Sequence, residues 1–317
     1  MSMPRFLKRL ALLAALLLAL AAGVLTHDGF TRWQTSPYPV ARSSFQSWDE
    51  VLAHPAPVTV ETLVTGSIDM NRCDNLDPSN PVVASCRSPA PLQDLVHVVQ
   101  HQRLGVFVVD AGFAARFADA PPYGNYSLAM QLFNRALGVH NAQSRGRSAA
   151  EVLRQRHLQP RAVFFTHLHP DHTSGSADLP ADVDYVFARD EQGFLARVAV
   201  GSHLAGKPHL RTLDYTSAEA MPPLGPAVDL LGDGSLWAIA TPGHTPGHTS
   251  YLVNGARPTL LVGDASHFAW AFEHDAAPRG WTSADGARAA RSLAQLRRFA
   301  ALYPQVRVVF GHELRTN

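Results

Sequence analysis

Phe165-Thr166-His167-Leu168-His169-Pro170-Asp171-His172 is the stretch of this 317-residue sequence that decides its fold. The apolar run 161–166 that leads into it predicts a buried strand. His167 and His169 lie two residues apart, so both face one way where the chain is extended. A proline then forces a turn that directs Asp171 and His172 toward a second position. Imidazoles and carboxylates bind zinc and similar metals, so four such groups within six residues predict a metal site.

Three further ligand-type residues follow predicted strands later in the chain. His244 follows residues 236–241 and opens the run His244-Thr245-Pro246-Gly247-His248. Asp264 follows residues 259–262, and His312 follows residues 306–310. Because all three lie at the carboxyl ends of strands, we expect them to converge on one edge of the fold.

These segments together resemble the metallo-β-lactamase-fold hydrolases. Residues 167–172 match the H-x-H-x-D-H signature of that family. The later Thr-Pro-Gly-His, Gly-Asp and Gly-His segments match its other motifs in order, and Asp110-Ala111-Gly112 resembles its early Asp-x-Gly turn. The resemblance spans roughly residues 58–317. It implies an α/β (α+β) fold, a four-layer αββα sandwich with a metal pair at one edge of the two sheets.

The resemblance also implies a role for each ligand-type residue. One metal would be held by His167, His169 and His244, the other by Asp171, His172 and His312, and Asp264 would bridge them. The cofactor implied is two Zn²⁺, although iron, manganese or cobalt also fits such ligands. A bridging hydroxide would attack the substrate carbonyl, and Asp171 would pass a proton to the leaving group. Asp110 either accepts a hydrogen bond from a ligand imidazole or stabilises its own turn.

Within that family, the sequence most resembles the N-acyl-homoserine lactonase branch. The shared features are the full ligand set, the Thr-Pro-Gly-His-x-Pro-Gly-His segment, the long insertion before the H-x-H motif and the short tail. The resemblance implies metal-dependent opening of a small-molecule ester or lactone. Those lactonases often carry a tyrosine three residues after the bridging aspartate, where this chain has His267. We expect His267 to face the substrate and donate a hydrogen bond to an oxyanion. Pro170 also departs from the branch, which often has an aromatic residue there.

Other functions stay open. Several β-lactamase branches have a cysteine where this chain has Asp264. Thioester hydrolases of the glyoxalase II type share the ligands but continue into a helical domain, whereas five residues follow His312. A non-catalytic metal-dependent binding protein is a further alternative, against which the complete ligand set weighs. A nucleic-acid partner is not expected, because 27 basic and 26 acidic residues give no broad positive surface. The sequence does not specify the oligomeric state.

The N-terminus carries a targeting pattern. Arg5, Lys8 and Arg9 precede the apolar run Leu10–Leu25, which predicts a signal peptide over residues 1–21. The alternative is an uncleaved membrane anchor that extends to about residue 25. We therefore expect an exported protein, periplasmic or secreted, or one anchored to the inner membrane. Contact with a membrane is expected only if the segment is retained. Residues 26–56 are predicted to be an irregular N-terminal segment, and residues 57–317 the catalytic domain.

Further predictions concern single residues. Cys73 and Cys86 either form a disulfide, which export favours, or remain free thiols. His248 is expected to hydrogen-bond within its turn.

Two helices are predicted, over residues 148–157 and from an N-cap at Ser283 to about Tyr303. The second has a buried stripe made of Ala289, Leu293, Leu296, Phe299, Ala300 and Leu302. Five aromatic residues either line a pocket for an acyl chain or belong to the ordinary core, namely Phe113, Phe117, Tyr123, Tyr126 and Phe133.

Overall fold

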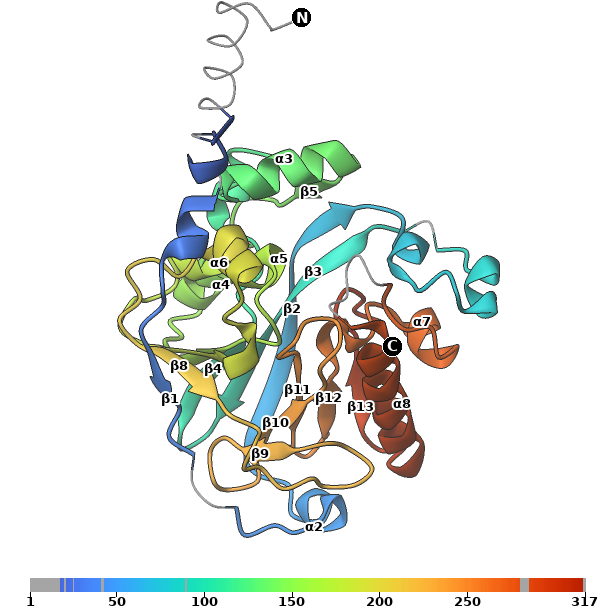
Figure 1. Cartoon of the computed structure of the whole chain (residues 1–317). Coiled ribbons are helices and arrows are strands. Elements are labelled where there is room, and N and C mark those ends of the chain that lie inside the picture. Colours follow the sequence, from blue (N-terminus) through green and yellow to red (C-terminus); the bar gives the residue numbers. More distant parts are fainter. Residues whose placement is uncertain are drawn as a thin grey trace, which may run out of the picture.

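The computed structural model describes residues 18–19, 21–24, 26–40, 43–88, 90–279 and 285–315. Within these ranges, two β-sheets stack face to face and helices cover their outer faces (Figure 1). The larger sheet has the strand order β1-β8-β7-β6-β4-β3-β2-β5, and the smaller has the order β13-β12-β11-β10-β9. This αββα arrangement confirms the predicted fold.

The larger sheet is formed by β1 (Thr35–Pro37), β2 (Val58–Asp69), β3 (Leu92–His101), β4 (Gly105–Val109), β5 (His140–Ala142), β6 (Pro160–Phe164), β7 (Asp184–Ala188) and β8 (Leu210–Leu213). The smaller sheet is formed by β9 (Ala227–Asp229), β10 (Leu236–Ala240), β11 (Thr249–Val253), β12 (Thr259–Leu261) and β13 (Arg307–Val309). Residues 18–19, 21–24 and 26–30 are helical. The later α-helices are α2 (Trp48–Ala53), α3 (Leu128–Leu137), α4 (Ala149–Gln155), α5 (Pro170–Thr173), α6 (Phe194–Val200), α7 (Ala269–Glu273) and α8 (Gly286–Leu302). Short 3₁₀ helices are η1 (Arg72–Asn75), η2 (Pro81–Ser85), η3 (Ala115–Ala118), η4 (Ser174–Asp178), η5 (Arg189–Glu191) and η6 (Gly263–Ala265).

Strand direction brings the predicted ligands to one edge. In the smaller sheet, β10 and β12 both run antiparallel to β11, and β13 runs parallel to β12. The carboxyl ends of β10, β12 and β13 therefore lie at the same edge, and the loops that carry His244, Asp264 and His312 follow them. In the larger sheet, β4 and β6 are parallel neighbours, so the loops with Asp110 and His167 also lie together.

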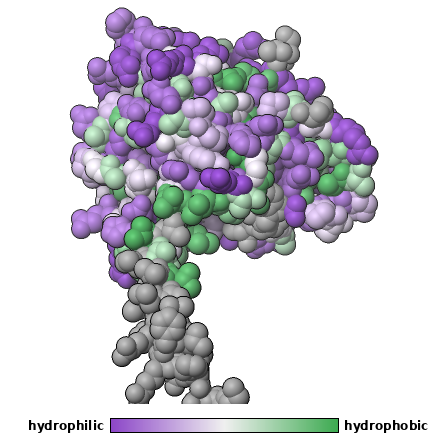
Figure 2. All heavy atoms as spheres, turned by 90° about the horizontal axis from the view of Figure 1, so that it is seen from above, coloured by the Kyte–Doolittle hydropathy of each residue, from purple (hydrophilic) through white to green (hydrophobic). Residues whose placement is uncertain are grey.

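The N-terminal region is only partly irregular. Residues 26–56 contribute β1, which pairs in parallel with β8, and α2, whose N-cap Ser47 accepts a hydrogen bond from the amide of Glu50 at 3.2 Å. Of the predicted signal peptide, residues 1–17 and 20 lie outside the described residues. Among the residues described, no helix is both long and apolar enough to cross a membrane. Figure 2 looks onto the end of the domain where the N-terminal residues lie, and hydrophobic residues gather there.

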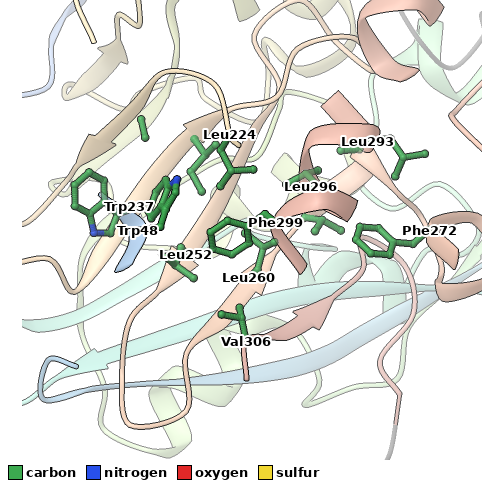
Figure 3. Packing of buried hydrophobic residues seen from close by; sticks show 14 of the residues in the cluster. Trp48, Leu224, Trp237, Leu252, Leu260, Phe272, Leu293, Leu296, Phe299 and Val306 are labelled. Atoms are coloured by element: carbon green, nitrogen blue, oxygen red, sulfur yellow. The ribbon is translucent and has the colours of Figure 1, made fainter. Parts of the chain in front are cut away.

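Three layers of hydrophobic packing hold the sandwich together. Between the sheets, Phe107 and Phe164 of the larger sheet pack with Tyr251 and Leu261 of the smaller one. The outer face of the larger sheet packs against α4 and α6. The outer face of the smaller sheet packs against α2 and α8, where Trp48, Trp237 and Phe299 meet (Figure 3).

Both predicted helices are present, with corrected details. Helix α4 begins after Ser148, which forms a capping box with Glu151. Helix α8 has Asp285 as its N-cap, since the Asp285 side chain accepts from the amide of Arg288 at 3.0 Å. The predicted cap Ser283 lies outside the described residues. Leu302 was wrongly placed in the buried stripe of α8 and is exposed. At about 100° per residue, it lies on the opposite side of the helix from Leu293.

The cysteine and aromatic alternatives are also resolved. Cys73 and Cys86 form a disulfide, which joins η1 to the loop after η2. Phe113, Phe117 and Tyr126 form a buried cluster with rings in contact, so they belong to the core. Tyr123 is half-buried, and Phe133 is exposed on α3.

Candidate metal centre

The seven predicted ligands lie together at the edge where the strands end. One ligand atom each from His167, His169, His244 and Asp264 lies within 4.8 Å of the others, and the same holds for Asp171, His172 and His312. Asp264 also groups with His312 and His267. Most of these side chains are buried, and only His169 and Asp171 are partly exposed. The open side of the cluster is therefore the side on which these two residues lie.

The spacing of the donor atoms suits metal ions. Asp264 Oδ2 lies 3.1 Å from His312 Nε2, 3.3 Å from His244 Nε2 and 3.8 Å from His167 Nε2. Asp264 Oδ1 lies 3.5 Å from His172 Nε2, which is in turn 3.6 Å from Asp171 Oδ2. Ligands placed 2.0–2.1 Å from a tetrahedral zinc ion lie about 3.3 Å from one another. The Asp264 carboxylate contacts both groups, as a bridging ligand must.

Several of the same atoms have no protein partner. His167 Nε2, His172 Nε2 and Asp264 Oδ1 are buried without a hydrogen bond. A buried polar atom without a partner costs about 1–3 kcal/mol of folding free energy. Because three such atoms lie in one cluster, we expect a bound ligand to contact them. Histidine nitrogens and carboxylate oxygens are donors that divalent transition metals accept, and the residues present therefore fit a metal pair.

Neighbouring residues fix the orientation of the ligand rings. His172 Nδ1 donates to Asp110 Oδ2 at 2.9 Å, and His312 Nδ1 donates to the carbonyl oxygen of Gln93 at 2.8 Å. Each bond uses one ring nitrogen and leaves Nε2 free to face the cluster. The predicted contact between Asp110 and a ligand imidazole is thus present. Asp110 also accepts from the amide of Thr166 at 2.8 Å, so it links the ends of β4 and β6.

Burial and charge give the two groups different proton affinities. Burial lowers the pKa of His167, His169 and His244, which favours the neutral imidazole that binds metals. Burial alone would also lower the pKa of His172, but the nearby carboxylates, Asp110 first, hold it well above its usual value. The carboxyl of Asp264 keeps a pKa far below normal despite its burial, because His312 and other imidazoles surround it. The cluster thus holds a buried anion among groups of opposite charge.

His248 supports the cluster without joining it. Its Nε2 accepts a hydrogen bond from the amide of Asp264 at 3.0 Å, so its Nδ1 must donate, and it lies 2.8 Å from Thr241 Oγ1. Burial lowers the pKa of His248 to about 3, which keeps the ring neutral, as this pattern requires. The predicted bond within the turn is present, and the structure adds a bond that holds the backbone of Asp264.

His267 faces the cluster as a further imidazole. Its Nε2 lies 3.2 Å from Asp264 Oδ2, and its ring stacks on that of His312 with centroids 5.5 Å apart. The side chain is buried, and its Nδ1 has no hydrogen-bond partner. The structure therefore places His267 beside the ligands, next to the residue that both groups share.

Glu191 is a contributor that sequence reasoning missed. Its buried carboxylate accepts from the amide of Leu168 at 2.9 Å and from the amide of Gly247 at 2.7 Å. It thereby joins the loop that carries His167 to the loop that carries His244. Burial raises the pKa of this carboxyl group. The residue follows β7 in the segment Arg189-Asp190-Glu191, where nothing in the sequence marks it as part of a site.

Replacement of Glu191 by Gln should weaken metal binding. The new amide group offers one acceptor oxygen for two backbone donors, so either Leu168 or Gly247 loses its bond at about 1–3 kcal/mol. Loss of a contact that orients the ligand residues typically lowers metal affinity by about 10–100-fold. Zinc titration against a competing chelator measures the change, and Asp190→Asn, at the exposed neighbouring position, is the matched control. Equal zinc affinity in both variants would show that Glu191 does not position the ligands.

Comparison with known proteins places this geometry in a family. The metallo-beta-lactamase superfamily profile matches residues 90–312. The N-acyl homoserine lactonase AttM of Agrobacterium fabrum is 31% identical over 159 residues, which are 48% of this chain and 57% of that protein. AttM of Rhizobium johnstonii is 27% identical over 243 residues, which are 71% of this chain and 82% of that protein. A hydroxyacylglutathione hydrolase of Albidiferax ferrireducens is 31% identical over 173 residues, 51% of this chain and 52% of that protein.

The chain thus spans only a little over half the length of some curated relatives that it matches. Among solved structures, Bacillus thuringiensis AiiA mutant F107W with N-decanoyl-L-homoserine bound has a similar fold. The TM-score is 0.61 at 16% identity, over 82% of this chain and 95% of that one. The profile covers well over half of this chain and includes all seven predicted ligands. The chain therefore belongs to the metallo-beta-lactamase superfamily.

Proposed function

We propose that this chain is a hydrolase that uses two zinc ions to open the ring of an N-acyl-homoserine lactone. The observation that carries the proposal is the position of the Asp264 carboxylate. It is buried, and its oxygens lie 3.1–3.8 Å from the Nε2 atoms of His312, His244, His172 and His167. A carboxylate within reach of both groups of ligands could serve two neighbouring metal ions, as two-metal hydrolysis needs.

The residues of the chain have separate roles in this proposal. His167, His169 and His244 would hold one ion, and Asp171, His172 and His312 would hold the other, with Asp264 within reach of both groups. When bound, such a pair supplies a hydroxide nucleophile near neutral pH and polarises the substrate carbonyl. Asp171 is partly exposed at the open side of the cluster. In this proposal, its carboxylate accepts the proton of the hydroxyl group that adds to the carbonyl and passes it to the departing ring oxygen. His267 donates a hydrogen bond to the oxyanion that forms on the carbonyl.

The choice of a lactone rests on the relatives. The match to one N-acyl homoserine lactonase extends over 82% of its length, whereas the match to the hydroxyacylglutathione hydrolase covers 52%. The second candidate is hydrolysis of a glutathione thioester, which the 31% identity to that hydrolase favours. Both reactions are acyl transfers to water, so the same cluster serves either one.

A substrate panel tests the proposal. The purified chain, loaded with zinc, is assayed against N-hexanoyl- and N-decanoyl-homoserine lactone, a lactoylglutathione thioester and a β-lactam. We expect the lactones to be opened fastest, with activity lost after treatment with a chelator and restored by zinc. Turnover of the thioester or the β-lactam with both lactones left intact would contradict the lactone assignment. Lactone opening that survives complete removal of metal would contradict the metal-dependent reaction.

The same panel separates the role of His267 from those of the ligands. In the His267→Ala variant, we expect lactone turnover to fall by about 10²–10³-fold, the usual effect of losing one oxyanion donor. Zinc content should stay unchanged, since the seven ligands remain. His274→Ala removes an exposed histidine from the neighbouring α7 end and is the matched control. Loss of zinc from the His267 variant would instead make that residue a ligand.

A further inference from the structure

One end of the domain exposes an unusual number of hydrophobic side chains. The described residues leave eleven large hydrophobic side chains exposed, and seven of them lie on α3, on α6 or at Phe30. Four are on α3, namely Leu128, Leu132, Phe133 and Leu137, and Leu132 and Phe133 are each 49% exposed. The concentration at one end is the feature that needs an explanation, because scattered exposed hydrophobic residues are ordinary.

These residues belong to one continuous surface. Phe30 packs edge-on against Phe194 of α6, with ring centroids 5.2 Å apart. Arg197 of α6 donates to the carbonyl oxygen of Gly29 at 2.9 Å, so the chain before β1 is attached to α6. Helix α3 contacts α6 in turn. Figure 1 shows α3 and residues 26–30 at the same end of the molecule. We call this surface, formed by α3, α6 and residues 26–30, the apolar end.

The sequence that precedes residues 26–30 has the chemistry of a membrane segment. Leu10–Leu25 contains no charged or polar side chain, and Arg5, Lys8 and Arg9 precede it. If this run crosses a bilayer as a helix, its 16 residues cover about 24 Å. The hydrocarbon core is about 30 Å thick, so the domain would be held close against the membrane. A lipid surface would therefore cover the side chains of the apolar end.

We propose that the chain retains its N-terminal segment as an anchor and that the apolar end lies on the lipid bilayer. The basic residues before Leu10 place the N-terminus on the cytoplasmic side and the domain on the outer side of the inner membrane. The Cys73–Cys86 disulfide agrees with that side, since disulfides persist in oxidising compartments. In this position, Leu132 and Phe133 of α3 enter the interface between headgroups and acyl chains.

Fluorescence quenching of the full-length chain in vesicles tests the contact. The sequence has two cysteines, and both are bridged, so a single introduced thiol is labelled specifically. A bimane label is attached at Leu132→Cys on α3, or at Leu302→Cys on α8, which is the exposed control. The vesicles contain phosphatidylethanolamine and phosphatidylglycerol with spin-labelled acyl chains. We expect severalfold stronger quenching at position 132, with the label about 5–10 Å within the interface.

Three outcomes would overturn the proposal. Equally weak quenching at both positions would mean that α3 faces water. Energy transfer between labelled chains at position 132, rising with protein concentration and without lipid quenching, would mean that a second copy covers the apolar end. Mass spectrometry of the protein from bacterial membranes tests the anchor separately. We expect the mature chain to include residues 1–21, and a chain that begins after Ala21 would contradict retention.

Discussion

Replacement of Asp264 by Ala is expected to remove both metal content and turnover. The Asp264 carboxylate lies between the two groups of ligands, so the variant leaves imidazoles at the centre of a buried cluster with no anion between them. A metal ion contributes several kcal/mol to transition-state stabilisation, so hydrolysis should fall on the order of 10³-fold or more. Elemental analysis and initial rates on the preferred substrate measure the two effects.

A matched variant keeps this result interpretable. Asp214→Ala removes an exposed carboxylate that pairs with Arg189 on the surface, and it should keep full metal content and turnover. Circular dichroism and a thermal melt check that both variants are folded. A folded Asp264→Ala protein that retains two metals per chain would exclude the shared carboxylate as a ligand. Retained turnover with lost metal would exclude metal-dependent hydrolysis.

Gly311→Ala is expected to disable the cluster without removing a ligand. A Cβ atom at this position would lie 2.2 Å from Asp264 Oδ1 and 2.8 Å from the backbone of Gly263. The carboxylate cannot swing away freely, because Asp264 Oδ2 lies 3.1 Å from His312 Nε2 and the Asp264 amide is held by His248. A displacement of about 1 Å within a catalytic site can cost roughly 10²-fold in rate. We therefore expect at least that loss in turnover, together with weaker zinc binding.

The glycine control uses a position with open space. Gly286→Ala at the start of α8 meets nothing within 4 Å, so it should leave zinc affinity, turnover and the melting temperature close to those of the unchanged chain. Zinc titration and rate measurements are made on both variants. Unchanged zinc affinity and turnover in Gly311→Ala would mean that the Asp264 side chain tolerates displacement. It would then not be held in one position by its neighbours.

The ligand-type residues were predictable because each carries a local signal. His167, His169, Asp171 and His172 lie within six residues directly after an apolar strand. His244, Asp264 and His312 each follow another strand, in motifs that the family shares. Parallel strands end at a common edge, so local order along the chain already implied convergence. The disulfide was only one of two alternatives in the sequence, because spacing does not reveal how close two cysteines come in the fold.

The residues that support the ligands had no such signal. Glu191 contacts two loops through backbone amides, and backbone amides are the same in every sequence. The contact of His312 with the Gln93 carbonyl joins residues 219 positions apart. The prediction that Leu302 is buried was wrong for a simpler reason. Leu302 continues the hydrophobic sequence at the end of α8, but its side chain lies on the exposed side of the helix.

The sequence by itself predicted mixed strands and helices and the side chains available to a metal pair, because hydrophobic periodicity and chemically distinctive residues are local properties of the chain. The sandwich fold and the family were implied by the resemblance of its motifs to the metallo-β-lactamase-fold hydrolases. Only the tertiary structure decided how the carboxylate of Asp264 is shared, which neighbours hold each imidazole and which end of the domain exposes hydrophobic residues. Those features depend on distances between segments far apart in the sequence, and the packing of the two sheets sets those distances.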